Sequence, residues 1–161
     1  MLRSVLSPED CAKCRFCCSF RRQSLWETPL FDPNTAKRLS EQYSEAKFKP
    51  AANGWYTIDI DDKYVTDDPE EEALCPFNKS GCVLSGSDKP FDCSIWPLRV
   101  MPDGDELAIC LTPTCPVISS NPLSVMQELA DSDIGSKVLE YARSHPEIVK
   151  ERHEGFPVLR K

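Results

Sequence analysis

Cys11-Ala12-Lys13-Cys14-Arg15-Phe16-Cys17-Cys18 places four cysteines within eight residues of this chain. Five more cysteines follow downstream, at Cys75, Cys82, Cys93, Cys110 and Cys115. Thiolate is a soft ligand that suits zinc, copper(I) and iron–sulfur clusters. Two thiols two residues apart can reach one metal from a single loop, and a later pair can complete a tetrahedron. The sequence therefore predicts a metal site before anything else.

Length and charge limit the functions that the chain can have. Its 161 residues are expected to form a single domain, and its formal net charge is -7. A net acidic chain makes general nucleic-acid or membrane-surface binding unlikely, because such binding depends on neutralising phosphate charge. Positive residues do flank the cysteine box, where they either compensate thiolate charge or dock an acidic protein partner. These residues are Lys13, Arg15, Arg21 and Arg22.

The cysteine content also predicts a compartment. Residues Met1–Pro8 contain no apolar segment long enough for a signal peptide, and no run approaches the ~20 apolar residues of a transmembrane helix. We therefore expect a cytoplasmic protein with no membrane partner. Disulfides are rare in the cytoplasm, where dense cysteine usually indicates metal binding or catalysis. The cysteine count is odd, so a fully disulfide-paired scaffold would leave one thiol over.

Hydrophobic patterning predicts an α+β fold, a small loop-rich domain organised around a cysteine metal site. Asp32-Pro33 is typical of a helix start, and the expected helix runs to about Phe48. The cysteine core spans about residues 9–117, a helical tail spans about 121–150, and the acidic run 67–72 is expected to be a solvated loop. The expected strands are 55–60 with a hairpin partner at 63–66, then 83–84 and 106–111; the expected tail helices are 121–130 and 131 or 132 to 144.

The cysteines fall into three groups of candidate ligands. Neighbouring residues of an extended chain point to opposite sides, so Cys17 and Cys18 are expected to serve a metal differently. Gly81 is expected to provide positive φ directly before Cys82. Cys110 lies in an apolar strand, where a buried structural thiol is common. The candidate metal ligands are Cys11, Cys14, Cys17, Cys18, Cys75, Cys82, Cys93, Cys115 and Cys110.

The ordered combination of CAKCRFCC, CPFNKSGC and KPFDCSIWP resembles the YkgJ-type cysteine-cluster family. The similarity covers roughly residues 9 to 117. It implies a zinc- or iron-chelating domain. The chain departs from the family pattern at Lys89 and Ser94, where the family has arginine, and at Trp96, where it has phenylalanine or tyrosine. These departures leave every cysteine intact and concern only the residues around the ligands.

Three functions remain open at this point. The first is a metal-binding domain that holds zinc or a 4Fe–4S cluster for electron transfer, metal handling or partner docking. The second is an iron–sulfur-dependent enzyme, with protein methyl transfer implied by the similar cluster of the flagellin lysine methylase group. The third is a thiol-redox sensor with a low-pKa thiol and no metal. Zinc and 4Fe–4S sites can both be built from four cysteines, so the sequence does not choose between them.

Overall fold

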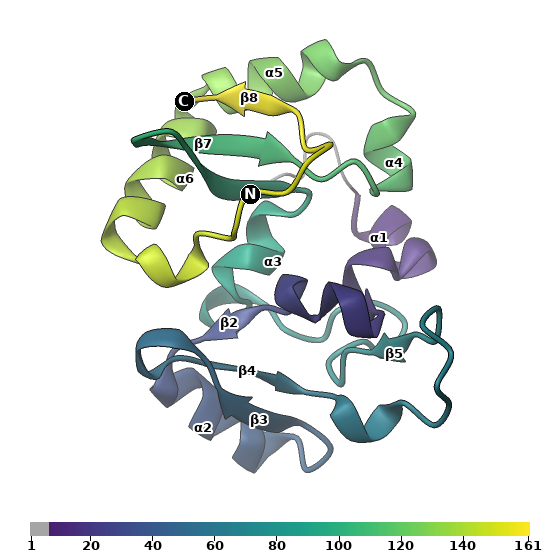
Figure 1. The fold of residues 1–161 in the computed structure, drawn as a ribbon. Coiled ribbons are helices and arrows are strands. Elements are labelled where there is room, and N and C mark those ends of the chain that lie inside the picture. Colours follow the sequence, from purple (N-terminus) through teal and green to yellow (C-terminus); the bar gives the residue numbers. More distant parts are fainter. Residues whose placement is uncertain (1–6) are drawn as a thin grey trace. The chain divides into compact units, whose positions relative to one another are not determined.

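The fold of a computed structural model, which describes residues 7–161, is drawn in Figure 1. It is an α+β fold, as the patterning predicts. The side chains of Pro8 and Cys11 lie outside the described part. The predicted lack of a signal peptide concerns residues 1–8 and therefore lies mostly outside it as well. Within residues 7–161, no helix combines the length and the apolar character needed to cross a membrane.

Short helices and short antiparallel strands alternate along the chain. The α-helices are α1 (Pro8–Cys14), α2 (Pro33–Gln42), α3 (Phe91–Ile95), α4 (Pro116–Ser119), α5 (Leu123–Asp131) and α6 (Asp133–Ser144). The 3-10 helices are η1 (Phe16–Cys18), η2 (Arg22–Glu27), η3 (Ala52–Gly54), η4 (Asp61–Lys63), η5 (Gly86–Asp88) and η6 (Pro146–Ile148). The strands are β1 (Ser19–Phe20), β2 (Leu30–Phe31), β3 (Lys47–Pro50), β4 (Tyr56–Asp59), β5 (Ala73–Leu74), β6 (Leu98–Asp103), β7 (Glu106–Leu111) and β8 (Val158–Arg160). They form three sheets, with the orders β1-β5, β2-β4-β3 and β6-β7-β8.

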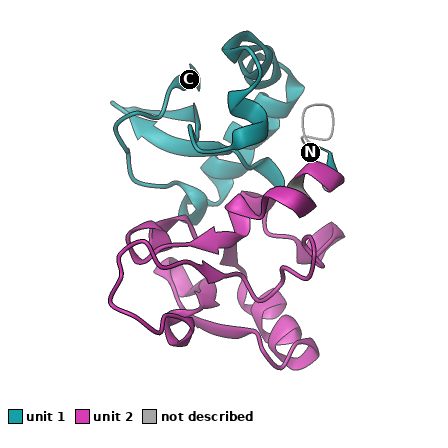
Figure 2. Ribbon diagram, turned by 90° about the vertical axis from the view of Figure 1, so that its right-hand side faces the viewer, with its two compact units in different colours: residues 1–7, 94–161 teal, residues 8–93 magenta. Residues whose placement is uncertain are grey.

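Two compact units make up the chain, as the two colours of Figure 2 show. We call residues 8–93 the N-terminal unit, and residues 94–161 together with 1–7 the C-terminal unit. The expected single domain stays a prediction. Seven of the nine cysteines, from Cys11 to Cys93, belong to the N-terminal unit, whereas Cys110 and Cys115 belong to the C-terminal unit.

The N-terminal unit has a hydrophobic core of its own, built on the β2-β4-β3 sheet and α2. Asp32 caps α2 by accepting hydrogen bonds from the backbone N–H groups of Asn34 and Thr35, both at 3.0 Å. Phe77, from the loop that carries Cys75, is 1% exposed and joins this core. Phe77 meets the rings of three other aromatic residues, with centroids 5.5 to 6.2 Å apart, namely Phe31, Tyr43 and Phe48.

Three predictions for this unit are wrong. The helix from Pro33 ends at Gln42, well before Phe48, because Phe48 lies in β3 opposite Ile58 of β4. Residues 63–66 do not form the predicted hairpin partner, because β2 and β3 occupy both edges of β4. Strand β4 itself confirms the strand predicted at 55–60. Residues 83–84 are not a strand.

In the C-terminal unit, the observed strands and helices agree better with those predicted from the sequence. Strands β6 and β7 form a hairpin through Gly104, whose φ of 67° suits a tight turn. The predicted strand 106–111 is β7, and the two predicted tail helices are α5 and α6. Ser132 caps α6 by accepting a hydrogen bond from the N–H of Ile134 at 3.2 Å. Strand β8 was not foreseen and pairs with β7.

Replacing Phe77 with alanine tests whether the ligand loop is anchored by the core. The change removes a fully buried ring, so we expect it to lower the free energy of unfolding by about 3–5 kcal/mol. Val65 is 85% exposed, so Val65→Ala is the control and should change the free energy by about 0.5 kcal/mol or less. Chemical denaturation followed by circular dichroism measures both. Equal effects of the two substitutions would contradict the anchoring role.

Candidate metal centre

The cysteine box is shaped by a sharp turn at Arg15. Helix α1 ends at Cys14, and Arg15 then adopts φ 52°, in the left-handed region that non-glycine residues rarely occupy. The turn leads into η1, where the N–H of Cys18 donates to the carbonyl oxygen of Arg15 at 2.9 Å. The backbone reversal therefore separates Cys14 from the Cys17–Cys18 pair.

Cys17 and Cys18 lie in a 3-10 helix rather than in an extended segment. Their Sγ atoms are 3.8 Å apart and share a hydrogen bond. The premise that the two side chains point to opposite sides is therefore wrong, since successive residues of a 3-10 helix are about 120° apart around the axis. The two sulfurs form a close dithiol pair. Whether both serve a metal stays open to experiment.

Backbone pairing brings Cys18 beside Cys75. Strands β1 and β5 pair with Ser19 opposite Leu74 and Phe20 opposite Ala73. The N–H of Cys75 then donates to the carbonyl oxygen of Cys18 at 2.7 Å, which extends the ladder by one bond. Two cysteines 57 positions apart in the sequence are thus joined directly through their backbones.

The loop from Cys75 to Cys82 contains a tight turn at Ser80 and Gly81. Ser80 and Gly81 have φ values of 72° and 119°, which confirms the positive φ expected at Gly81. A Cβ placed on Gly81 would lie 3.4 Å from the Cβ of Ala12, so α1 packs closely on this turn. The loop closes through the N–H of Lys79, which donates to the Gly81 carbonyl at 2.9 Å.

Four thiols of the N-terminal unit lie near enough to one another for their charges to interact. We call Cys18, Cys75, Cys82 and Cys93 the thiol tetrad, because an electrostatic interaction acts within every pair among them. Burial, with smaller contributions from the charges of Cys18 and Cys82, raises the pKa of Cys75 to about 12. Burial likewise raises the pKa of Cys82 and, more strongly, that of Cys93.

Cys18 behaves in the opposite way from the rest of the tetrad. The pKa of Cys18 is lowered to about 6, chiefly by a hydrogen bond from Cys17. A hydrogen bond from Asn78 and the positive charge of Lys89 contribute to this lowering, and burial opposes it. Sequence reasoning missed the contributions of Asn78 and Lys89. The only sequence indication of these contributions was that Asn78 lies in the motif CPFNKSGC and Lys89 in KPFDCSIWP.

The other predicted ligands have different surroundings. Cys14 is half-buried at the end of α1, and the side chain of Cys11 is outside the described part. Cys110 is fully buried in β7, where Arg152 donates a hydrogen bond to its Sγ at 3.3 Å. Cys115 is buried at the N-terminus of α4. Among the cysteines whose side chains are described, none forms a disulfide.

The described cysteine side chains are not arranged as they would be around a bound metal ion. No group of three or more His, Cys, Asp or Glu side chains that could hold a metal ion is found among them. The arrangement does collect soft sulfur donors from three separate motifs in one unit. Cysteine side chains reorient by rotation about χ1, so the backbone positions matter more than the individual sulfur positions.

No family model matches this chain, and no curated protein or solved structure matches it either. The likeness to the YkgJ-type family therefore stays an expectation from the sequence motifs.

The lowered pKa of Cys18 can be measured by alkylation of the metal-free chain. Thiolate is the reactive form, so a pKa of about 6 predicts that Cys18 reacts at neutral pH and loses reactivity as the pH falls through about 6. Cys75, with a pKa of about 12, should stay unreactive across this range. Iodoacetamide labelling with peptide mass spectrometry reads each site. Equal labelling of Cys18 and Cys75 at pH 7 would contradict the electrostatic description.

Proposed function

We propose that this protein binds zinc or a 4Fe–4S cluster through the thiolates of Cys18, Cys75, Cys82 and Cys93. The observation that supports the proposal best is the mutual electrostatic interaction of these four thiols within one unit. Four cysteine sulfurs are the donor set of both kinds of centre. A bound metal would supply the positive charge around which the four sulfurs can gather.

Charge balance explains why a cation suits the tetrad. Each thiolate makes the ionisation of the next one harder, and burial adds to this cost. Lys89 and Lys63 provide two nearby positive charges, fewer than the four negative charges of a fully ionised tetrad. A divalent metal or an iron–sulfur cluster lowers the cost of ionising the remaining thiols. The same reasoning makes metal binding couple to folding of the loops that carry the ligands.

Metal analysis of tetrad variants tests the proposal. Iron, zinc and acid-labile sulfide are measured per chain on protein purified without oxygen. We expect either about one zinc, or about four irons with four sulfides, in the unaltered chain. Cys75→Ser should lose most of this metal, because serine removes a soft donor.

Cys110→Ser is the matched control for this experiment. Cys110 lies in β7 of the C-terminal unit and contacts Arg152, so we expect its substitution to leave the metal content unchanged. Loss of metal from both variants, or a chain that holds no metal under any of these conditions, would contradict the proposed site.

Proton release provides an independent prediction. At pH 7.5 Cys18 is already a thiolate, whereas the raised pKa values of Cys75, Cys82 and Cys93 keep those thiols protonated. Zinc binding to the metal-free chain should therefore release about three protons per zinc, and the affinity should fall as the pH is lowered. Calorimetry in buffers of different ionisation enthalpy measures this number. Release of no protons would exclude binding by these thiols.

One observation favours a second function, a thiol-redox sensor. Cys18 combines a lowered pKa with a neighbouring thiol 3.8 Å away, and a thiolate beside a second thiol is the arrangement that oxidises readily. A disulfide between adjacent residues is strained, so another thiol of the tetrad would be the better partner for Cys18. This function requires a metal-free protein, so the metal analysis above decides between the two. A cytoplasmic location, a protein partner and an enzymatic role remain predictions.

A further inference from the structure

Two chain segments lead directly into the tetrad and hold each other by polar contacts. Residues 19–23 follow Cys18, and residues 64–72 precede Cys75 through strand β5. We call the contacts between residues 19–23 and residues 64–72 the clamp. The predicted solvated loop at 67–72 is therefore engaged with the chain that follows the cysteine box.

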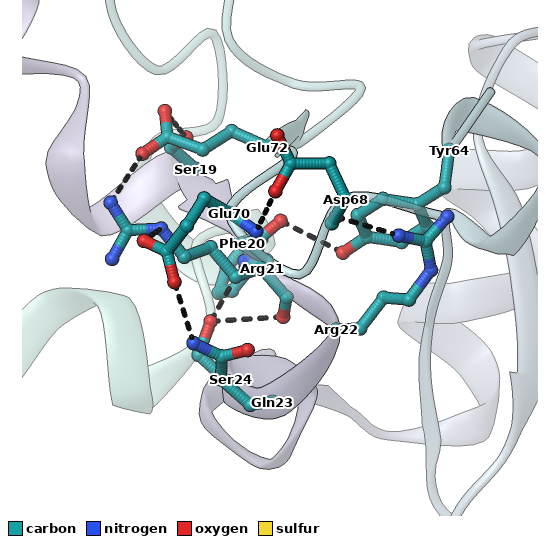
Figure 3. Close-up of polar contacts among 10 residues, drawn as sticks. All are labelled: Ser19, Phe20, Arg21, Arg22, Gln23, Ser24, Tyr64, Asp68, Glu70 and Glu72. Atoms are coloured by element: carbon teal, nitrogen blue, oxygen red, sulfur yellow. Dashed lines mark hydrogen bonds and ion pairs between the residues drawn. The ribbon is translucent and has the colours of Figure 1, made fainter. Parts of the chain in front are cut away.

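Arg22 makes the most extensive contacts of the clamp. Its guanidinium donates to the carbonyl oxygen of Asp68 at 3.1 Å and to that of Thr66. The same group lies over the ring of Tyr64, 4.5 Å from the ring centroid. The hydroxyl of Tyr64 donates in turn to the carbonyl oxygen of Phe20 at 2.8 Å, within strand β1 (Figure 3). Arg22 and Tyr64 thus fasten residues 64–68 to the segment next to Cys18.

Glu71 is the best-satisfied carboxylate of the clamp. It accepts hydrogen bonds from the N–H of Val65 at 2.7 Å and from the N–H and hydroxyl of Thr66, both at 3.0 Å. Arg22 donates to the same carboxylate at 3.2 Å. The Glu71 side chain is only 14% exposed, whereas that of Glu70 is 61% exposed. The Glu71 carboxylate therefore joins backbone donors of its own segment, residues 64–72, to the Arg22 guanidinium of the other segment.

The remaining contacts reach the strand pair itself. The Ser19 hydroxyl donates to Glu72 at 2.7 Å, and Arg21 contacts Glu72 at 3.4 Å and Glu70 at 3.3 Å (Figure 3). Ser19 and Leu74 are opposite each other in the β1-β5 pair. Strands of two residues provide few backbone bonds, so side-chain contacts such as these carry much of the pairing.

We propose that the clamp sets the metal affinity of the tetrad by holding Cys18 beside Cys75 before metal arrives, with Glu71 and Arg22 as positioning residues. This inference rests on the proposed function. A site that is assembled only part of the time binds its ligand more weakly by the fraction of time it is assembled. Loosening the clamp lowers that fraction without removing any sulfur. Because Arg22 and the glutamates are partly exposed, salt screens their attraction and weakens metal binding.

The test compares Glu71→Gln with Asp67→Asn in the full chain. Zinc affinity of the reduced, metal-free protein is measured by competition with a colorimetric chelator, well below its thermal unfolding temperature. Loss of a carboxylate that accepts several hydrogen bonds should weaken zinc binding roughly tenfold for Glu71→Gln. Asp67 is an exposed residue of the same acidic run, so the control Asp67→Asn removes one negative charge there and should change zinc affinity less than about twofold. Raising salt from about 0.1 M to about 1 M should weaken zinc binding more for the unaltered chain than for Glu71→Gln.

Amide hydrogen exchange separates the clamp from the metal site. The N–H of Cys75 is bonded to the carbonyl oxygen of Cys18, so its exchange reports whether the two segments are joined without metal. Glu71→Gln should speed this exchange in the metal-free protein, and Asp67→Asn should leave it unchanged. If the unaltered chain binds no zinc but this pattern of exchange holds, the proposed function fails and the clamp stands. Equal exchange rates and equal zinc affinities in the two variants would overturn the clamp.

Discussion

The hydrogen bond from the N–H of Cys75 to the carbonyl oxygen of Cys18 is the constraint on which the candidate site depends. It joins the N-terminal cysteine box to the second cysteine motif through the backbone rather than through a metal. Backbone donors and acceptors are obligatory hydrogen-bonding groups, so this bond and the side-chain contacts of the clamp together fix the relative position of two candidate ligands. Cys82 and Cys93 then approach the same region from a loop anchored by Phe77 and from α3.

The electrostatics of the thiols follow from this placement. Bringing Cys75, Cys82 and Cys93 into a partly buried region raises the pKa of each, and their proximity makes ionisation of the last one hardest. Cys18 escapes this trend because Cys17 donates a hydrogen bond to it. Without metal, the tetrad therefore combines one thiolate with three protonated thiols at neutral pH. Under the proposed function, a metal that binds all four sulfurs lowers the cost of ionising those three thiols.

The residues of the candidate site could be chosen from the sequence, but their geometry could not. The four cysteines of the tetrad are among the predicted ligands, and Gly81 adopts the positive φ that its place before Cys82 suggested. The conformation of Cys17 and Cys18 was not predictable, because it depends on the left-handed turn at Arg15, a residue type that carries no such signal. Strands β1 and β5 escaped notice since two residues are too few to show a period of two.

Long-range contacts explain what the sequence did not indicate. Arg21 and Glu72 are 51 residues apart, and nothing in their local sequence shows that the acidic run meets the arginines beside the cysteine box. The Lys-Phe-Lys alternation at residues 47–49 was the missed indication of β3, since Phe48 faces the core between two lysines. In both cases the structure depends on pairing with a distant segment, which the local sequence does not reveal.

X-ray absorption spectroscopy at the metal edge of the loaded protein identifies the atoms that bind the metal. For a zinc-loaded chain, we expect a first shell of four sulfur neighbours at about 2.3 Å, supplied by the thiol tetrad. For an iron-loaded chain, we expect a first shell of sulfur only, from cysteine and sulfide. A first shell that contains nitrogen or oxygen in place of any of these sulfurs would contradict binding by the tetrad.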